Sequence, residues 1–233
     1  QWSNFDESFS GKPVSQQRKH SEWNLEDKNW GWWQTLVKKY YGDISLVDMC
    51  FGLIVEALDK AGIADNTVII FASDHGDSMG SHRHFEKAGT MYEEVMRIPL
   101  IMKIPGQLES RISHFVRLMD VMPTILEIAD VDSPSDLDAQ SFLTLLKEDE
   151  SVNWPDSVYC EHHGEVWGYQ TQRMVRTKRW KYVFNPHDID ELYDMKIDPF
   201  EMENLISASG METIIEEMKG RLLGWNDETR DFI

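Results

Sequence analysis

The sequence predicts an α/β fold that continues into a small antiparallel sheet with a C-terminal helix. A β-branched run over 67–72 stops abruptly at polar residues, as a strand covered on both faces does. A second apolar run follows over 99–104, and we expect the two strands to be parallel. Apolar residues recur at steps of three and four over 34–61, which predicts one face of a long amphipathic helix. Beyond residue 157 the runs are short and β-rich, and a helical pattern over 211–223 closes the chain.

The region that precedes the long helix shows no strand. Five tryptophans crowd it among polar neighbours: Trp2, Trp23, Trp30, Trp32 and Trp33. Aromatic side chains of this size normally bury most of their surface. Two interpretations stay open, a partner in a part of the molecule outside this sequence and an ordinary aromatic-rich loop.

Turn and cap residues divide the rest of the chain. Gly62 suits the C-terminal cap of the long helix, and Asp120 can cap a helix that runs to Ala129. We place a domain boundary near Asp149–Trp154, which gives an α/β portion over 1–150 and a smaller domain over 151–233. Four β-rich runs suggest an antiparallel sheet in the second: 157–161, 172–176, 181–184 and 191–193.

Asp74 and His75 follow the first strand directly. Ligands bind beyond the carboxyl ends of strands in parallel α/β sheets. A carboxylate oxygen and an imidazole nitrogen are both ligands for divalent cations, so the pair predicts half of a metal site. The alternative is an ordinary turn, because Asp and Gly are common turn residues. His82 and Lys87 follow closely, and such groups suit an anionic substrate beside a metal.

Several ordered motifs resemble the late metal-binding segment and closing pattern of the type I sulfatases, in the alkaline phosphatase superfamily. The resemblance covers nearly all of the chain from about Trp33 onward. In chain order, the matching motifs include Asp74-His75-Gly76-Asp77, Gly80-x-His82, Lys87-x-x-Thr90-Met91-Tyr92-Glu93, Arg97-x-Pro99-Leu100-Ile101, Arg173-Met174-Val175-Arg176-Thr177, Trp180-Lys181-Tyr182 and Glu191-Leu192-Tyr193-Asp194.

The resemblance implies a metal-dependent sulfuric ester hydrolase that cleaves sulfate monoesters. Asp74 and His75 would be ligands of a divalent metal, Ca²⁺ in this family, with Mn²⁺ or Zn²⁺ as alternatives because of the histidine. Lys87 would contact the sulfate group. His82 would either hydrogen-bond the leaving oxygen or brace a metal ligand, and both roles stay open. His75 favours the branch with choline-sulfatase-like and phosphonate-monoesterase-like members, since many sulfatases carry Asn there.

Three further groups have simpler interpretations. Asp77 is expected to cap local backbone amides, and His84 to be a loop histidine. His162 and His163 are expected to be exposed, with substrate contact as the alternative.

One family element is missing. The family's nucleophile, a formylglycine made from Cys or Ser, lies in a Cys/Ser-x-Pro-x-Arg motif, and neither Cys50 nor Cys160 is followed by such residues. The early paired aspartates are also absent. We therefore expect the C-terminal part of a sulfatase that is inactive alone, with the N-terminal half as its partner. Two alternatives are a phosphonate or phosphate ester hydrolase of the same superfamily and a non-catalytic binding module.

Composition sets the outer limits. The 233 residues are 41% hydrophobic, enough for a core, and the net charge of −18 disfavours nucleic acid and anionic membranes as partners. No apolar run reaches the length of a membrane helix. The two cysteines form no disulfide framework and are most simply buried. We favour a cytoplasmic location over a periplasmic or secreted one, and expect a small-molecule or saccharide sulfate ester as substrate.

Overall fold

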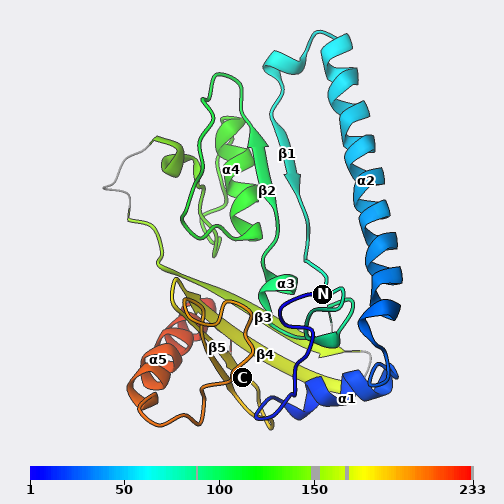
Figure 1. Cartoon of the computed structure of the whole chain (residues 1–233). Coiled ribbons are helices and arrows are strands. Elements are labelled where there is room, and N and C mark those ends of the chain that lie inside the picture. Colours follow the sequence, from blue (N-terminus) through cyan, green and yellow to red (C-terminus); the bar gives the residue numbers. More distant parts are fainter. Residues whose placement is uncertain (88, 148–152, 166–167, 232–233) are drawn as a thin grey trace. The chain divides into compact units, whose positions relative to one another are not determined.

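A computed structural model describes residues 1–87, 89–147, 153–165 and 168–231 (Figure 1). The chain forms two compact units, residues 1–108 and 109–233. The boundary expected near Asp149–Trp154 falls mostly on residues 148–152, which lie outside the described residues, so it stays a prediction. Among the described residues, no helix combines the length and the apolar character needed to cross a membrane.

The first unit contains three α-helices and one pair of strands among its described residues (Figure 1). In chain order its elements are α1 (Val14–Glu22), α2 (Trp30–Lys60), the 3₁₀ turn η1 (Ala64–Asn66), β1 (Ile69–Ala72), the 3₁₀ turn η2 (Ser81–Arg83), α3 (Glu93–Met96) and β2 (Leu100–Lys103).

An aromatic cluster forms the core of the N-terminal part of this unit. Phe5, Leu25 and Trp33 are buried in it, and the partly buried side chains around them include Trp2, Trp23, Trp30 and Phe85. Four of the five early tryptophans therefore find partners within this unit. Trp32 packs edge to face on Trp33, with ring centroids 5.3 Å apart, but it is 39% exposed.

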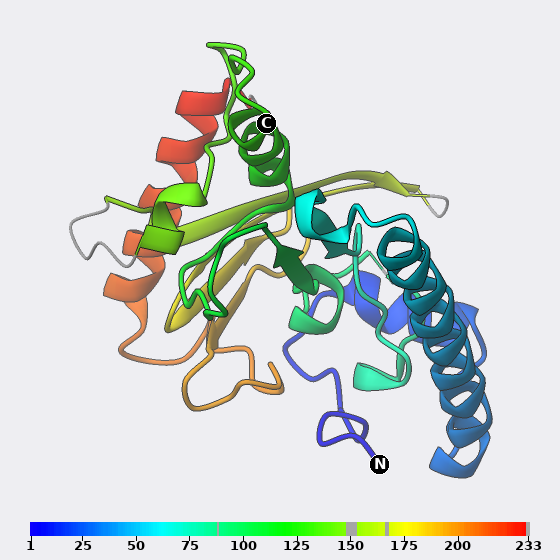
Figure 2. The same ribbon diagram turned by 90° about the horizontal axis from the view of Figure 1, so that it is seen from above.

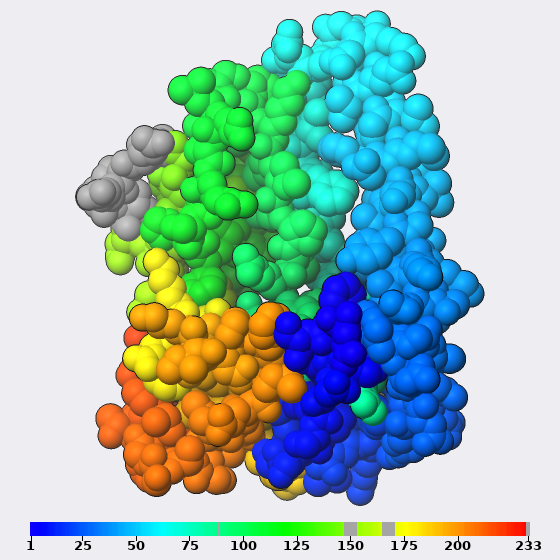
Figure 3. Space-filling model, in the orientation of Figure 1, coloured from blue at the N-terminus to red at the C-terminus, as the bar shows by residue number. Residues whose placement is uncertain are grey.

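Helix α2 ends where predicted, but it begins four residues earlier, at Trp30 instead of Gln34, and it lacks most of the predicted burial. Asn29 caps its start by accepting a hydrogen bond from the Trp32 backbone N–H at 3.1 Å. Gly62 follows its end at φ +68°, the left-handed conformation expected of a glycine cap. Only Trp33 and Val37 are buried, and every residue over 41–50 is exposed. Of the apolar residues predicted to face a core, Ile44, Val47 and Ile54 are exposed within this chain. Figure 3 shows α2 in light blue to cyan.

The parallel arrangement expected for the two strands is wrong. β1 and β2 pair antiparallel, with Ile69 opposite Lys103 and Ala72 opposite Leu100. A run of β-branched residues favours a buried strand. It does not predict the direction of the strand, because strands can be buried in both parallel and antiparallel sheets. β1 is half-buried and not enclosed on both faces. Its Phe71 ring packs edge to face on Phe51 of α2, with ring centroids 5.3 Å apart.

The second unit carries a four-stranded antiparallel sheet in the order β3-β4-β5-β6. The strands span Ser157–Glu165, Gly168–Thr177, Trp180–Phe184 and Glu191–Asp194, and they are preceded by η3 (Leu118–Asp120), α4 (Val121–Ile128) and η4 (Leu143–Lys147). Helix α5 (Glu212–Thr229) lies along one face of the sheet (Figures 1 and 2).

Apolar residues from both layers form the core of this unit. Met218 and Leu222 of α5 pack against Val175, Tyr182 and Leu192 of the strands, and all five are buried. The predicted small antiparallel sheet with a covering helix is confirmed.

Candidate functional site

Asp74 and His75 lie just beyond the carboxyl end of β1, next to the start of β2. Both side chains are accessible, at 81% exposed for Asp74 and 40% for His75. The His75 Nε2 lies 3.5 Å from the Asp74 Oδ2. The His75 Nδ1 lies 2.8 Å from the Gly76 carbonyl oxygen, to which its N–H donates, so Nε2 is the ring nitrogen on the side of Asp74.

Gly76 holds this dipeptide against helix α3. Its backbone N–H donates to the Val95 carbonyl oxygen at 2.8 Å. A Cβ atom at position 76 would lie 1.9 Å from the Glu94 carbonyl oxygen, a distance at which one of the two backbones must shift. Only glycine allows this close approach of two backbone segments.

The charges around Asp74 favour its ionised form. The His75 backbone N–H, which donates to Asp74 Oδ1 at 3.0 Å, lowers the pKa of Asp74, and the charges of His75 and Lys87 act in the same direction. Lys87 is exposed in the loop that precedes Thr90. The charge of Lys87 is the weakest of the causes that shift this pKa, so Lys87 acts on the predicted metal ligand from a distance, although 13 residues separate the two in sequence.

The loop between them is tied down by local hydrogen bonds. Asp77 Oδ1 accepts from the Met79 backbone N–H at 2.8 Å, which confirms its expected capping role. The Ser78 N–H donates to the Glu86 carbonyl oxygen at 2.9 Å, one residue before Lys87.

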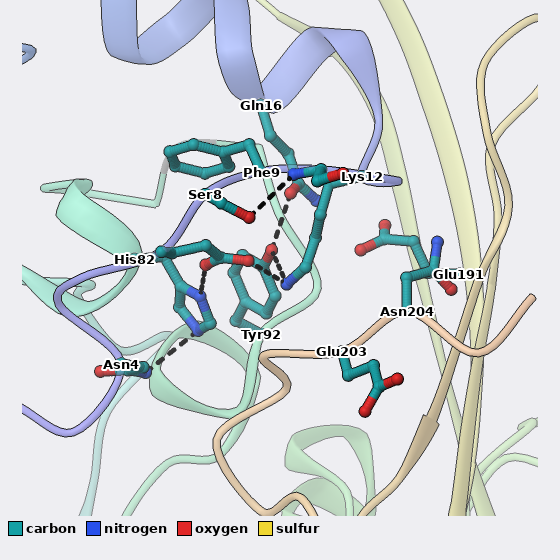
Figure 4. A network of polar contacts seen from close by, with 12 residues as sticks. Asn4, Ser8, Phe9, Lys12, Gln16, His82, Tyr92, Glu191, Glu203 and Asn204 are labelled. Atoms are coloured by element: carbon teal, nitrogen blue, oxygen red, sulfur yellow. Dashed lines mark hydrogen bonds and ion pairs between the residues drawn. The ribbon is translucent and has the colours of Figure 1, made fainter.

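His82 is buried and has partners on both ring nitrogens (Figure 4). Its Nδ1 contacts the Glu7 carboxylate, and its Nε2 lies 3.0 Å from the Asn4 amide nitrogen. Its ring stacks on Tyr92, with centroids 3.6 Å apart and planes 5° apart. Lys12 completes the group, because its ammonium pairs with Glu7 and donates to the Tyr92 hydroxyl at 2.9 Å. Sequence reasoning missed Glu7 and Lys12, because their contacts with His82 and Tyr92 join residues 75 and 80 positions apart.

His84 lies in a loop, as expected, but it is fully buried. Its Nε2 lies 3.1 Å from the Gln16 carbonyl oxygen, and the rings of Phe9 and Trp23 are among its neighbours. Burial lowers the pKa of His84 from 6.5 to about 3, so the side chain is neutral in the fold.

A second histidine site occurs in the other unit. Glu161, His163 and Asp231 place one ligand atom each within 4.8 Å of one another, and no other such trio occurs among the described residues. The Asp231 carboxylate is already held by the buried Arg173, which lowers the pKa of Asp231. Because the Arg173 guanidinium pairs with Asp231, we interpret Glu161, His163 and Asp231 as part of an ion-pair network. His163 is exposed, as expected, whereas His162 is half-buried.

The residues present at β1 fit one part of a metal shell. Asp74 offers an ionised oxygen, and His75 offers a nitrogen whose tautomer is fixed by Gly76. Ca²⁺ takes six to eight oxygen ligands, so two donors leave most of such a shell to be supplied by other groups. An accessible carboxylate and imidazole after a strand, with a lysine nearby, are compatible with a metal-dependent hydrolase of anionic esters.

Comparisons with known proteins agree with this class. The sulfatase family matches residues 5–131, and the C-terminal family of N-sulphoglucosamine sulphohydrolase matches residues 80–228. The chain therefore belongs to the sulfatase family. It is 33% identical over 196 residues to YidJ of Escherichia coli K12, described as an uncharacterized sulfatase, and 32% identical over 202 residues to an arylsulfatase of Clostridium perfringens. These alignments cover 82% and 81% of this chain but 38% and 41% of the two relatives.

Solved structures support the fold. A 2-O GAG sulfatase superposes with a TM-score of 0.90 at 26% identity, covering 99% of this chain and 52% of that one. The phosphonate monoester hydrolase of Agrobacterium radiobacter superposes with a TM-score of 0.77 at 26% identity, over 87% of this chain and 43% of that one. The chain thus has the fold of part of a sulfatase and spans about 40% of the length of the two curated relatives.

Proposed function

We propose that this chain supplies the second part of the active site of a metal-dependent sulfuric ester hydrolase. Asp74 and His75 are the metal ligands in this proposal, and Lys87 is the residue that binds the sulfate group. The observation that carries it is the arrangement at the end of β1. There an ionised Asp74 and the tautomer-fixed Nε2 of His75 face one another, and the Lys87 charge acts on the same carboxylate.

The chemistry of each residue follows from its position. A divalent cation at Asp74 and His75 would act as a Lewis acid toward the ester oxygens. Lys87 is a compact, mobile positive charge that suits a tetrahedral oxyanion without fixing its orientation. His82 is buried with partners on both nitrogens, which favours the bracing role over contact with the leaving oxygen.

We also propose that the catalytic nucleophile, a formylglycine, belongs to a preceding segment of a longer protein. The two relatives extend well beyond the matched region. The open apolar face of α2 supports this, because exposed residues such as Ile44, Val47 and Ile54 would be covered by further chain. Ca²⁺ is the proposed metal, with Mn²⁺ and Zn²⁺ as alternatives.

The proposed substrate is a sulfate ester of a saccharide. One relative, 34% identical over 188 residues, is an N-acetylglucosamine-6-O-sulfatase of Bacteroides thetaiotaomicron, and the matching 2-O GAG sulfatase acts on a saccharide by its name as well. Both names support the substrate class and leave the particular sugar open.

Turnover by two proteins tests the proposal. The 233-residue chain and the longer protein that contains it are assayed with p-nitrophenyl sulfate, and with a p-nitrophenyl phosphonate for comparison. The proposal expects no turnover by the chain alone and preferred cleavage of the sulfate by the longer protein. Preferred cleavage of the phosphonate would favour the related hydrolase activity. Inactivity of the longer protein on both esters would favour a binding module.

A further inference from the structure

Glu7 is a buried anion with two partners in the first unit. Its carboxylate contacts both the Lys12 ammonium and the Nδ1 of His82, and all three side chains are at most 2% exposed (Figure 4). A buried charge is stable only when it is paired, so removing this carboxylate takes a charged partner away from both Lys12 and His82. The contact also assigns the Nδ1 proton of His82, which leaves Nε2 to accept from the Asn4 amide at 3.0 Å.

The backbone at His82 needs this support. His82 and Arg83 have φ values of +53° and +50°, the left-handed region that side chains with a Cβ rarely occupy. Residues in such conformations persist only where their surroundings hold them. Here the His82 N–H donates to the Asn4 carbonyl oxygen at 3.0 Å, and the ring is clamped between Glu7 and the stacked Tyr92.

The same group is connected to the metal-ligand dipeptide through α3. Tyr92, on which His82 stacks, is the residue at the start of α3. Asn4 donates to the Glu94 side chain of this helix at 2.6 Å. Two residues of α3 in turn fix Gly76, Val95 by its carbonyl hydrogen bond and Glu94 by backbone contact. The contacts run without a break from Glu7 to the residue beside His75.

We propose that Glu7 is a positioning residue: acting through His82 and α3, it holds Asp74 and His75 in the orientation needed to bind metal. This inference rests on the proposed function, in which those two side chains are the ligands. It assigns a role to an N-terminal segment that touches neither ligand. Supporting residues of this kind commonly change metal affinity by one to two orders of magnitude.

The experiment uses the 233-residue chain and NMR. Amide hydrogen exchange is measured at Gly76, whose N–H is bonded to Val95, and Mn²⁺ binding is followed by paramagnetic broadening of the His75 ring signals. Three variants are compared with the wild-type chain. Glu7→Gln removes the anion without changing its shape, and Asn4→Leu removes the contact on the other side of His82. Glu22→Gln removes one negative charge from an exposed position of the same segment and serves as the control.

The inference expects Glu7→Gln to speed exchange at Gly76 and weaken Mn²⁺ binding at His75, each by roughly tenfold, with no change in the control. Unchanged exchange at Gly76 while the His82 ring signals move would overturn it. Uniform loss of protection throughout the first unit would also overturn it, because that is the result of a purely structural role. If Glu7→Gln does not fold, the positioning role is tested with Asn4→Leu by the same criteria. If Mn²⁺ does not broaden the His75 signals of the wild-type chain, whose two donors supply only part of a metal shell, metal content is compared between Glu7→Gln and wild type in the longer protein. Exchange at Gly76 tests the positioning role in either case.

Discussion

The Nε2 of His75 lies 3.5 Å from the Oδ2 of Asp74, too far for a good hydrogen bond and with neither atom enclosed. The opposite ring nitrogen donates to Gly76, so Nε2 is the ring nitrogen that faces the ionised oxygen of Asp74. A carboxylate oxygen and an imidazole nitrogen are both ligands for divalent cations. A cation bound between these two atoms would gain a contact with each.

Replacing Lys87 should separate catalysis from stability. In the longer protein, Lys87→Ala should lower kcat/KM on the order of a hundredfold, because one electrostatic partner of the developing charge is lost. Its effect on the free energy of unfolding should stay below about 0.5 kcal/mol, since the side chain is exposed. Lys60→Ala is the control, because that lysine is also exposed.

The conservative replacement sharpens this prediction. Lys87→Arg should restore little of the rate, because a planar guanidinium does not replace a compact ammonium in a tight site. Kinetics of Lys87→Ala equal to those of Lys60→Ala would return Lys87 to the role of a solvated loop residue.

Gly76→Ala should destabilise the first unit. The added Cβ would lie 1.9 Å from the Glu94 carbonyl oxygen, so the backbones must separate at a cost of about 1–3 kcal/mol. Gly52→Ala is the matched control, because a Cβ there meets no atom within 4 Å and alanine favours a helix. Urea unfolding of both variants measures the difference. Equal effects of the two substitutions would mean that the close approach at Gly76 is unimportant.

Stability should fall in acid because of His84. Below pH 6.5 the unfolded chain takes up a proton at this residue, whereas the folded chain excludes it until the pH approaches about 3. The free energy of unfolding should therefore decrease as the pH falls through this window, with a contribution of about 2 kcal/mol from His84 between pH 6.5 and 5. His84→Phe should flatten the dependence, as measured by urea unfolding at several pH values. An equally steep dependence in this variant would assign the effect to other groups.

A buried ion pair in the second unit should be sensitive to the loss of one partner. The Lys181 ammonium lies 2.7 Å from the Glu201 carboxylate, and both side chains are at most 1% exposed. Lys181→Met removes a buried charged partner of Glu201 and should cost about 3–5 kcal/mol. Lys219→Met, at a half-exposed lysine, is the control. A cost below 1 kcal/mol for Lys181→Met, on the scale of an exposed pair, would show that the carboxylate finds another partner or takes up a proton.

The sequence was sufficient for features that depend on local pattern. The C-terminal end of α2 followed from a periodic apolar pattern and Gly62, whereas its start lies four residues before the predicted one. The sheet with its covering helix followed from short β-rich runs before a helical one. The position of Asp74 just beyond a strand could also be predicted, because an apolar run that stops at polar residues indicates the end of a strand.

Features that depend on contacts between residues far apart in the chain could not be predicted from the sequence. The direction of β2 relative to β1 is set by the path of the connecting loop, on which strand composition carries no information. Glu7 looked like one acid among many, because its partner His82 lies 75 residues away. The exposure of α2 was also hidden, since an apolar face predicts burial whether or not the covering segment belongs to the sequence.

The metal content of an Asp74 variant tests the central claim most directly. In the longer protein, Asp74→Asn removes an anionic ligand while keeping the shape of the side chain, and Asp65→Asn changes an exposed aspartate outside the site. Bound metal is measured by mass spectrometry and turnover with an aryl sulfate. The account predicts that Asp74→Asn loses metal and activity together while Asp65→Asn keeps both. Retention of both by Asp74→Asn would contradict the assignment of Asp74 as a metal ligand.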